Sequence, residues 1–185
     1  MYLISIEKEL KRLERAQDWL ERSWERAASD MPITAPRVSR WTLAQHLHHT
    51  AHANAALLKA LADHNPAKDA PTTGRPNLGG ILVLLLRRMP RGRARSPKRY
   101  HPPEKPEPDE VSQQIRASRT QLTAVAKDPQ RLKNLAGVLK HPVLGFLTPP
   151  RWLCVARIHA EHHIRIMRDI ETEGLPTSTS KTANP

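Results

Sequence analysis

Residues 148–172 read TPPRWLCVARIHAEHHIRIMRDIET and decide the fold. Thr148 followed by proline is a helix start signal, because threonine caps a first turn and proline is tolerated at the first helical position. Apolar residues then recur every three or four positions, as in an amphipathic helix that packs one face against a core. His159 and His163 belong to the same stripe. The pattern predicts a helix that carries two imidazoles, one turn apart, into the interior of the molecule.

Three further amphipathic segments precede this one. They run from about Ser5 to Ala28, from about Arg40 to Asp63 and from about Asp109 to Lys127. Aromatic residues make up only 4% of the chain, which disfavours an all-β architecture. Four helices of roughly 20 residues each predict an all-α protein with the architecture of a four-helix bundle.

The connection between the second and third helices is long, basic and rich in proline. Nine of the 17 prolines of the chain lie between Asn65 and Pro108. The apolar run LGGILVLLL interrupts this segment, and we expect it to pack on the bundle rather than bind lipid. We therefore expect one domain over residues 1–172, with a crossover over residues 63–108 and a disordered tail over residues 173–185. No hairpin signal of the Asn-Gly or Asp-Gly kind occurs.

The net charge of +12 is concentrated in the crossover. Seven cations and no acid lie between residues 87 and 99, which leaves +5 for the other 172 residues. Prolines and a glycine interrupt the run, so we interpret it as a loop rather than a recognition helix. A solvated connector is favoured over a nucleic-acid or membrane-surface patch. The seven cations are Arg87, Arg88, Arg91, Arg93, Arg95, Lys98 and Arg99.

Histidines carry the chemistry that the sequence suggests. Seven of the ten fall in two short windows, His46, His48, His49 and His52 on the second helix and His159, His162 and His163 on the last. A pair at positions i and i+4 presents two ring nitrogens to one point, as in helical zinc sites. The windows together therefore favour a metal site over hydrogen-bonded or surface histidines.

A third ligand is expected from the second helix, and two histidines compete for that role. Periodicity favours His46, which lies about 60° from the leucine stripe of this helix, over His49 at about 120°. His49, however, heads a stripe of alanines where a neighbouring backbone can approach and a ring has room. We expect His48 and His52 to face solvent.

Two stretches resemble the signature regions of the DinB/YfiT-like superfamily. They are WTLAQHLHHTA, which begins at Trp41, and HPVLGFLTPPRWLCVARIHAEHHIRIM, which ends at Met167. The resemblance is to a branch of unknown function with a His-Pro-x-x-Gly-x-Leu-Thr segment before the last helix. It implies a DinB-like bundle, often dimeric, and a divalent metal ion bound by His49, His159 and His163. Where the family often has a polar residue such as Gln after the last histidine, this chain has Ile164, Arg165 and Ile166.

An ion bound by three neutral imidazoles keeps one position open, which is typical of catalytic rather than structural sites. Characterised relatives implied by the resemblance are thiol S-transferases and an isomerase that use a low-molecular-weight thiol. We expect a metal-dependent transferase or hydrolase in which zinc or nickel activates a thiol or water toward a small-molecule substrate. The alternatives are a non-catalytic metal-binding or stress-response protein and, less favoured, a nucleic-acid binder through residues 87–99. No catalytic residue is assigned; the residues expected around the ligands are Gln17, Gln45, His46 and His162.

The remaining expectations concern location and assembly. No apolar run reaches the length of a membrane span, and the N-terminus lacks the apolar region of a secretory signal. The single cysteine, Cys154, excludes an internal disulfide and is expected to pack in the core. We expect a cytoplasmic protein and, from the resemblance, a homodimer.

Overall fold

The computed structural model describes residues 4–27, 33–66, 68, 73–92 and 97–174. Ala28, Arg93, Arg95 and the expected tail beyond residue 174 lie outside the described residues. Within the described part the elements follow one another as α1 (Ile6–Ala27), α2 (Leu43–Asp63), α3 (Leu78–Leu86), the 3-10 helix η1 (Lys98–Tyr100), α4 (Pro108–Ala126), α5 (Pro129–Asn134), β1 (Leu139–His141), β2 (Gly145–Leu147) and α6 (Pro149–Gly174).

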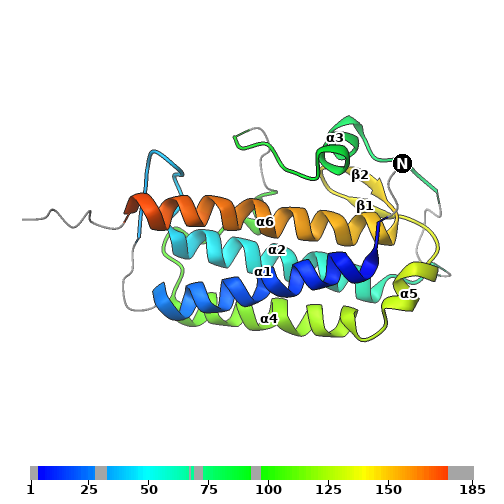
Figure 1. The fold of residues 1–185 in the computed structure, drawn as a ribbon, viewed down its shortest axis with the longest axis horizontal. Coiled ribbons are helices and arrows are strands. Elements are labelled where there is room, and N and C mark those ends of the chain that lie inside the picture. The colour runs from blue at the N-terminus through cyan, green and yellow to red at the C-terminus, as the bar shows by residue number, and fades with distance from the viewer. Residues whose placement is uncertain (1–3, 28–32, 67, 69–72, 93–96, 175–185) are drawn as a thin grey trace, which may run out of the picture.

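Four long helices form the bundle (Figure 1). Both α1 and α2 pack against α4 and α6, so α1 and α2 lie on opposite corners. Because α2 and α4 run in the same direction, the crossover between them returns along the bundle (Figure 1). The prediction of an all-α bundle with a long crossover between its second and third long helices is confirmed.

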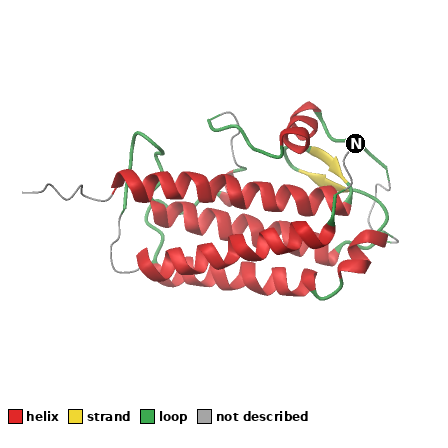
Figure 2. Ribbon diagram, in the orientation of Figure 1, coloured by secondary structure: helices red, strands yellow, loops and turns green. Residues whose placement is uncertain are grey.

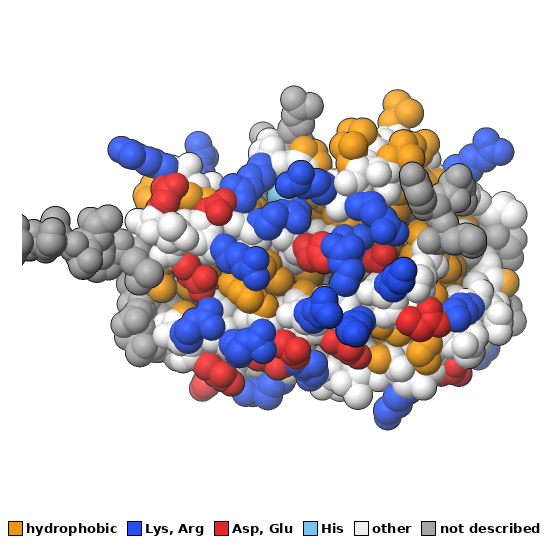
Figure 3. Space-filling model, in the orientation of Figure 1, with side chains coloured by type: hydrophobic (Ala, Val, Ile, Leu, Met, Phe, Trp, Pro, Cys, Tyr) orange, Lys and Arg blue, Asp and Glu red, His pale blue; other side chains and the backbone are white. Residues whose placement is uncertain are grey.

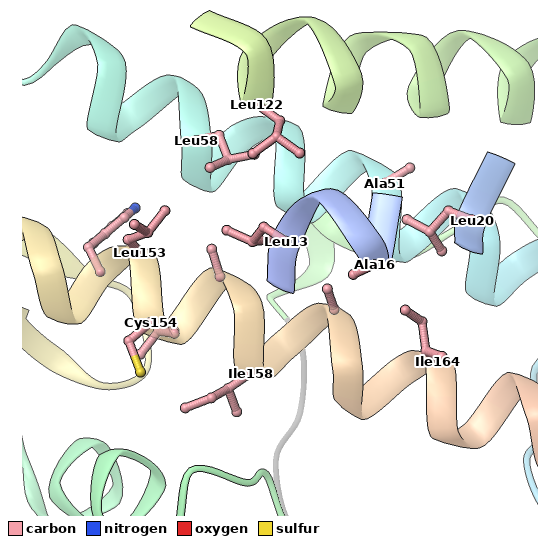
Figure 4. Close-up of a cluster of buried hydrophobic side chains, with 14 of the residues drawn as sticks. Leu13, Ala16, Leu20, Ala51, Leu58, Leu122, Leu153, Cys154, Ile158 and Ile164 are labelled. Atoms are coloured by element: carbon pink, nitrogen blue, oxygen red, sulfur yellow. The ribbon is translucent and has the colours of Figure 1, made fainter. Parts of the chain in front are cut away.

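Apolar side chains from all four long helices meet along the axis of the bundle (Figure 4). Leu20 of α1, Leu58 of α2, Leu122 of α4 and Leu153 of α6 are each at most 2% exposed. Cys154 lies in the same cluster, as expected, and burial raises the pKa of its thiol. The core is therefore apolar over most of its length.

An ion cluster ties α1 to α6. Arg157, which is fully buried, donates from Nε to Glu9 at 2.7 Å and from Nη1 to Glu161 at 2.9 Å. Arg12 donates two hydrogen bonds to Glu161, each 2.8 Å long. Arg87 of the crossover donates to Glu9 at 3.3 Å. The cluster therefore also fastens the crossover to the bundle.

A two-stranded antiparallel hairpin, β1 with β2, precedes α6 at one end of the bundle (Figure 2). The sequence predicts no hairpin here, because each strand has three residues and the turn carries no Asn-Gly or Asp-Gly pair. The His141 ring closes the turn instead. Its Nδ1 accepts hydrogen bonds from the backbone N–H groups of Val143 at 3.2 Å and Leu144 at 3.1 Å.

Helix α3 packs on the bundle as expected, where it contacts α6, but it does so through one narrow face. Its buried residues are Gly80 and Val83, and Leu84 packs partly on the core. The side chains of five other aliphatic residues are exposed: Leu78, Ile81, Leu82, Leu85 and Leu86. Nine residues are too few for periodicity to show which face a short helix buries. In the described part of the chain, no helix combines the length and apolar character of a membrane span.

Candidate metal centre

Three histidines from two helices converge in the bundle. His49 of α2 and His159 and His163 of α6 each offer a ring nitrogen, and these nitrogens lie within 4.8 Å of one another. Their ring centroids are 4.7–5.3 Å apart. His49 and His163 are buried, and His159 is partly exposed. These are the three residues that the resemblance to the DinB/YfiT-like superfamily implies as ligands.

Local sequence explains why the helices bring these rings together. One turn of α6 separates His159 from His163, so the two rings lie on the same face. On α2 the residues near His49 include Ala51 and Ala53, which are 0% and 7% exposed. Of these two, Ala53 belongs to the alanine stripe of the sequence, so the stripe is buried next to His49.

Backbone and side-chain oxygens orient two of the rings. His49 Nδ1 lies 2.7 Å from the backbone oxygen of Tyr100, and His159 Nδ1 lies 3.1 Å from Asn54 Oδ1. Both oxygens only accept hydrogen bonds, so each Nδ1 carries the proton and donates it. The Nε2 atom of each ring is then unprotonated and has its lone pair available for a metal ion.

The third ring is held by another histidine. His163 Nδ1 lies 3.2 Å from His46 Nδ1, and His46 Nε2 lies 2.9 Å from Ser39 Oγ. When His163 donates from Nδ1, His46 accepts and in turn donates from Nε2 to the serine oxygen. This proton arrangement leaves His163 Nε2 free, so all three rings can offer the same type of atom.

Burial keeps these imidazoles neutral. Burial is the main reason why the pKa of His46 is lowered to about 3 and that of His49 to about 4. Burial also lowers the pKa of His159 and of His163 well below the ordinary value of 6.5, and the neighbouring histidines lower it further. Neutral imidazole is the form that binds metal ions, so the donor set fits a divalent cation near neutral pH.

Of the residues expected around the ligands, two histidines are in place. His46 contacts His163 as described, so the helical wheel that favoured His46 identified a neighbour of the cluster. The His162 ring lies 5.0 Å from the His163 ring between centroids, and burial and then Arg165 lower its pKa to about 4.

The two glutamines serve other elements. Gln17 of α1 donates to the backbone oxygen of Ile115 at 3.0 Å and accepts from Ser118, both on α4. Gln45 caps α2 with Thr42 and donates to the backbone oxygens of Pro103 and Glu104. Gln45 thus holds the crossover against α2. These contacts differ from the expectation that both amides lie beside the histidines.

His48 and His52 are not the solvent-facing residues that the sequence suggests. His48 is 7% exposed and His52 is partly buried, with their ring centroids 5.9 Å apart. Among the described residues, the buried Nδ1 atoms of both rings have no hydrogen-bond partner. The ring centroids of Tyr100 and His52 are 5.4 Å apart. The crossover therefore covers a face of α2 that a helical wheel of this helix alone would assign to solvent.

Three further residues lie around the cluster, and of these only Trp41, the first residue of a signature stretch, stands out in the sequence. Trp41 contacts both His46 and His49, with ring centroids 5.3 and 4.9 Å apart. Asn54 is a buried polar residue among the alanines of α2, which could have marked it as a partner of a ring. Tyr100 acts through its backbone oxygen, so no side-chain pattern could have revealed it.

Two arginines of the basic run form ion pairs with acidic residues of the bundle. Arg91 forms an ion pair with Asp169 of α6 at 2.6 Å, in addition to the pair between Arg87 and Glu9. Arg91 also lowers the pKa of His46 and of His162, and Arg88 lowers that of Arg165. The run is therefore not only a solvated connector, because it places positive charge near the histidine cluster.

Comparison with known proteins shows similarity to a protein family over most of the chain. The family model described as the DinB superfamily matches residues 12–167. The matched range includes most of α1, all of α2 and α4, and α6 as far as both of its clustered histidines. No curated protein and no solved structure matches the chain.

Proposed function

The chain belongs to the DinB superfamily, and on this basis we propose that it binds a divalent metal ion through His49, His159 and His163 and uses it in a transferase or hydrolase reaction. One observation carries the proposal. Each of the three rings can commit its Nδ1 proton to an acceptor and leave Nε2 for the ion, while ring nitrogens of all three lie within 4.8 Å of one another.

The ligand type determines what the ion would supply. Three neutral imidazoles would leave a divalent ion its full charge, and such an ion would supply a nucleophile by lowering the pKa of water or of a thiol. Zinc and nickel are our first candidates, because imidazole suits both.

The protein's own residues would position the ligands and attract the cosubstrate. Tyr100, Asn54 and His46 each hold one ligand ring in a fixed orientation. Arg91 and Arg165 place positive charge beside His162. This charge would favour an anionic cosubstrate, such as a low-molecular-weight thiol that carries carboxylates. We assign no general base.

A cobalt(II) titration tests this proposal. The protein is reconstituted with cobalt and titrated with cysteine, and the absorption band of a cobalt–thiolate bond is followed. We expect the band in the parent protein and its loss in His163→Ala, with helicity unchanged by circular dichroism. Cobalt uptake without the band, and without turnover of thiol, epoxide or ester substrates, would instead favour a non-catalytic metal-binding protein.

A further inference from the structure

Helix α3 presents an unusual surface for a protein of such high charge. Its nine residues, LGGILVLLL, contain no polar side chain. Leu78, Leu82 and Leu85 are 86%, 49% and 73% exposed, and Ile81 and Leu86 are also exposed. These five positions follow the spacing i, i+3, i+4, i+7 and i+8, which places them on one side of the helix. Figure 3 shows hydrophobic side chains projecting from the edge of the molecule over α3.

Contacts at both ends fix this face outward. Asn77 caps the helix by accepting from Gly80 N at 2.9 Å and donates to the backbone oxygen of Val143 in the hairpin at 2.8 Å. A side chain at Gly80 would collide with the backbone oxygen of Leu144, so the helix lies directly on the hairpin turn. At the other end, Arg87 forms its ion pair with Glu9. The exposure of the leucines therefore results from a defined packing arrangement.

Positive charge flanks the apolar face. Arg75 precedes the helix and Arg87 and Arg88 follow it directly; all three are exposed. The run that continues to Arg99 contains no acidic residue. Figure 3 shows Lys and Arg side chains, with some Asp and Glu side chains between them, on the surface below the hydrophobic projection. An apolar helix face with flanking cations is the arrangement by which interfacial helices bind anionic bilayers.

We propose that α3 and its flanking arginines bind the surface of an anionic lipid bilayer, with the exposed leucines inserted at the boundary between headgroups and acyl chains. A second copy of this chain is disfavoured as the occupant, because a two-fold interface would bring the flanking arginines of both copies together. A specific protein partner is also less well matched. Protein interfaces usually contain aromatic anchors and hydrogen-bonding groups, and the exposed face of α3 has only aliphatic side chains. The acyl chains of a bilayer accept such side chains without aromatic anchors or hydrogen bonds.

Co-sedimentation of the full chain with vesicles tests this proposal. One set contains phosphatidylcholine alone, and the other contains phosphatidylcholine mixed with phosphatidylglycerol. We expect binding to the mixed vesicles that weakens as salt is raised, with little binding to neutral vesicles. The double variant Leu82→Ser/Leu85→Ser should bind the mixed vesicles at least about tenfold more weakly, because two apolar side chains no longer enter the bilayer.

Matched variants complete the design. Leu82→Met/Leu85→Met keeps the face apolar and should bind like the parent, whereas Arg75→Gln/Arg88→Gln should lower binding to anionic vesicles only. All changed side chains are exposed, so the variants should retain the helicity and the metal content of the parent. No binding of the parent to either vesicle would overturn the proposal. So would equal binding by the serine variant, or a parent dimer in sedimentation velocity that the serine variant dissociates.

Discussion

At the scale of single residues, the candidate metal centre depends on groups behind the ligands. Three imidazoles could rotate or change tautomer, but the backbone oxygen of Tyr100, the Asn54 amide and the His46 ring each engage one Nδ1 atom. Such partners typically set ring orientation and raise ligand basicity. The metal affinity should therefore depend on residues that do not bind the ion.

Asn54 gives the cleanest test of this dependence. We expect Asn54→Ala to weaken metal binding about 10- to 100-fold, because His159 loses the acceptor of its Nδ1 proton. Competition with a chromophoric chelator measures the affinity. Asn54→Asp keeps an acceptor at the same position and should stay close to the parent. An unchanged affinity in Asn54→Ala would contradict this role.

The buried ring of His141, in the hairpin before α6, leads to a prediction about the pH dependence of stability. Burial lowers the pKa of this ring from 6.5 to about 4. Between these values the unfolded chain binds a proton that the folded chain does not, so the free energy of unfolding falls as the pH decreases from 6.5 toward 4. His141 should contribute at most about 3 kcal/mol to this loss.

The variant His141→Asn separates titration from the hydrogen bonds of the turn. Asparagine can accept from backbone N–H groups two and three residues further on, and it does not titrate in this range. Urea unfolding at about pH 7 and about pH 5 should show a smaller loss of stability in the variant than in the parent. Equal losses in the two proteins would refute the assignment.

At the scale of elements, long helices could be predicted and short ones could not. The stripes of α1, α2, α4 and α6 repeat often enough to show both the helix and its buried face. The hairpin and α3 are too short for such periodicity, and contacts between them fix how α3 lies. His52 illustrates the same limit, because Tyr100 of the crossover, whose ring contacts it, is distant in sequence. For the candidate metal centre, the spacing of the histidines in the sequence identifies the two windows that supply the rings. The choice of His49 over His46 as the third ligand required the family resemblance.

The buried ion cluster makes the pairing of α1 with α6 testable. Arg157 is 0% exposed and Glu9 is 2% exposed, so removal of Glu9 leaves the buried Nε–H of Arg157 without its acceptor, while Glu161 still pairs with Arg157. We expect Glu9→Leu to lower the free energy of unfolding by about 1–3 kcal/mol. The double variant Glu9→Leu/Arg157→Leu should be clearly more stable than the sum of the single changes predicts. Additive losses in a double-mutant cycle would contradict this coupling.

At the scale of the whole molecule, the apolar core should keep the bundle folded without metal. The ion would bind the folded chain and stabilise it by mass action, by about 2.7 kcal/mol at a hundredfold excess over Kd. Chelation should therefore lower the melting temperature while leaving the helical signal at room temperature intact. Loss of that signal on chelation would show that the metal is structural. The homodimer and the cytoplasmic location stay predictions.

The most direct test of the central claim is the metal content of the purified and reconstituted protein, measured by elemental analysis beside three variants. His49→Ala and His163→Ala remove proposed ligands, and His52→Ala removes a histidine from α2 outside the cluster. We predict about one divalent ion per chain in the parent and in His52→Ala, and none in the two ligand variants, with equal helicity throughout. A parent without metal, or ligand variants that retain it, would contradict the account.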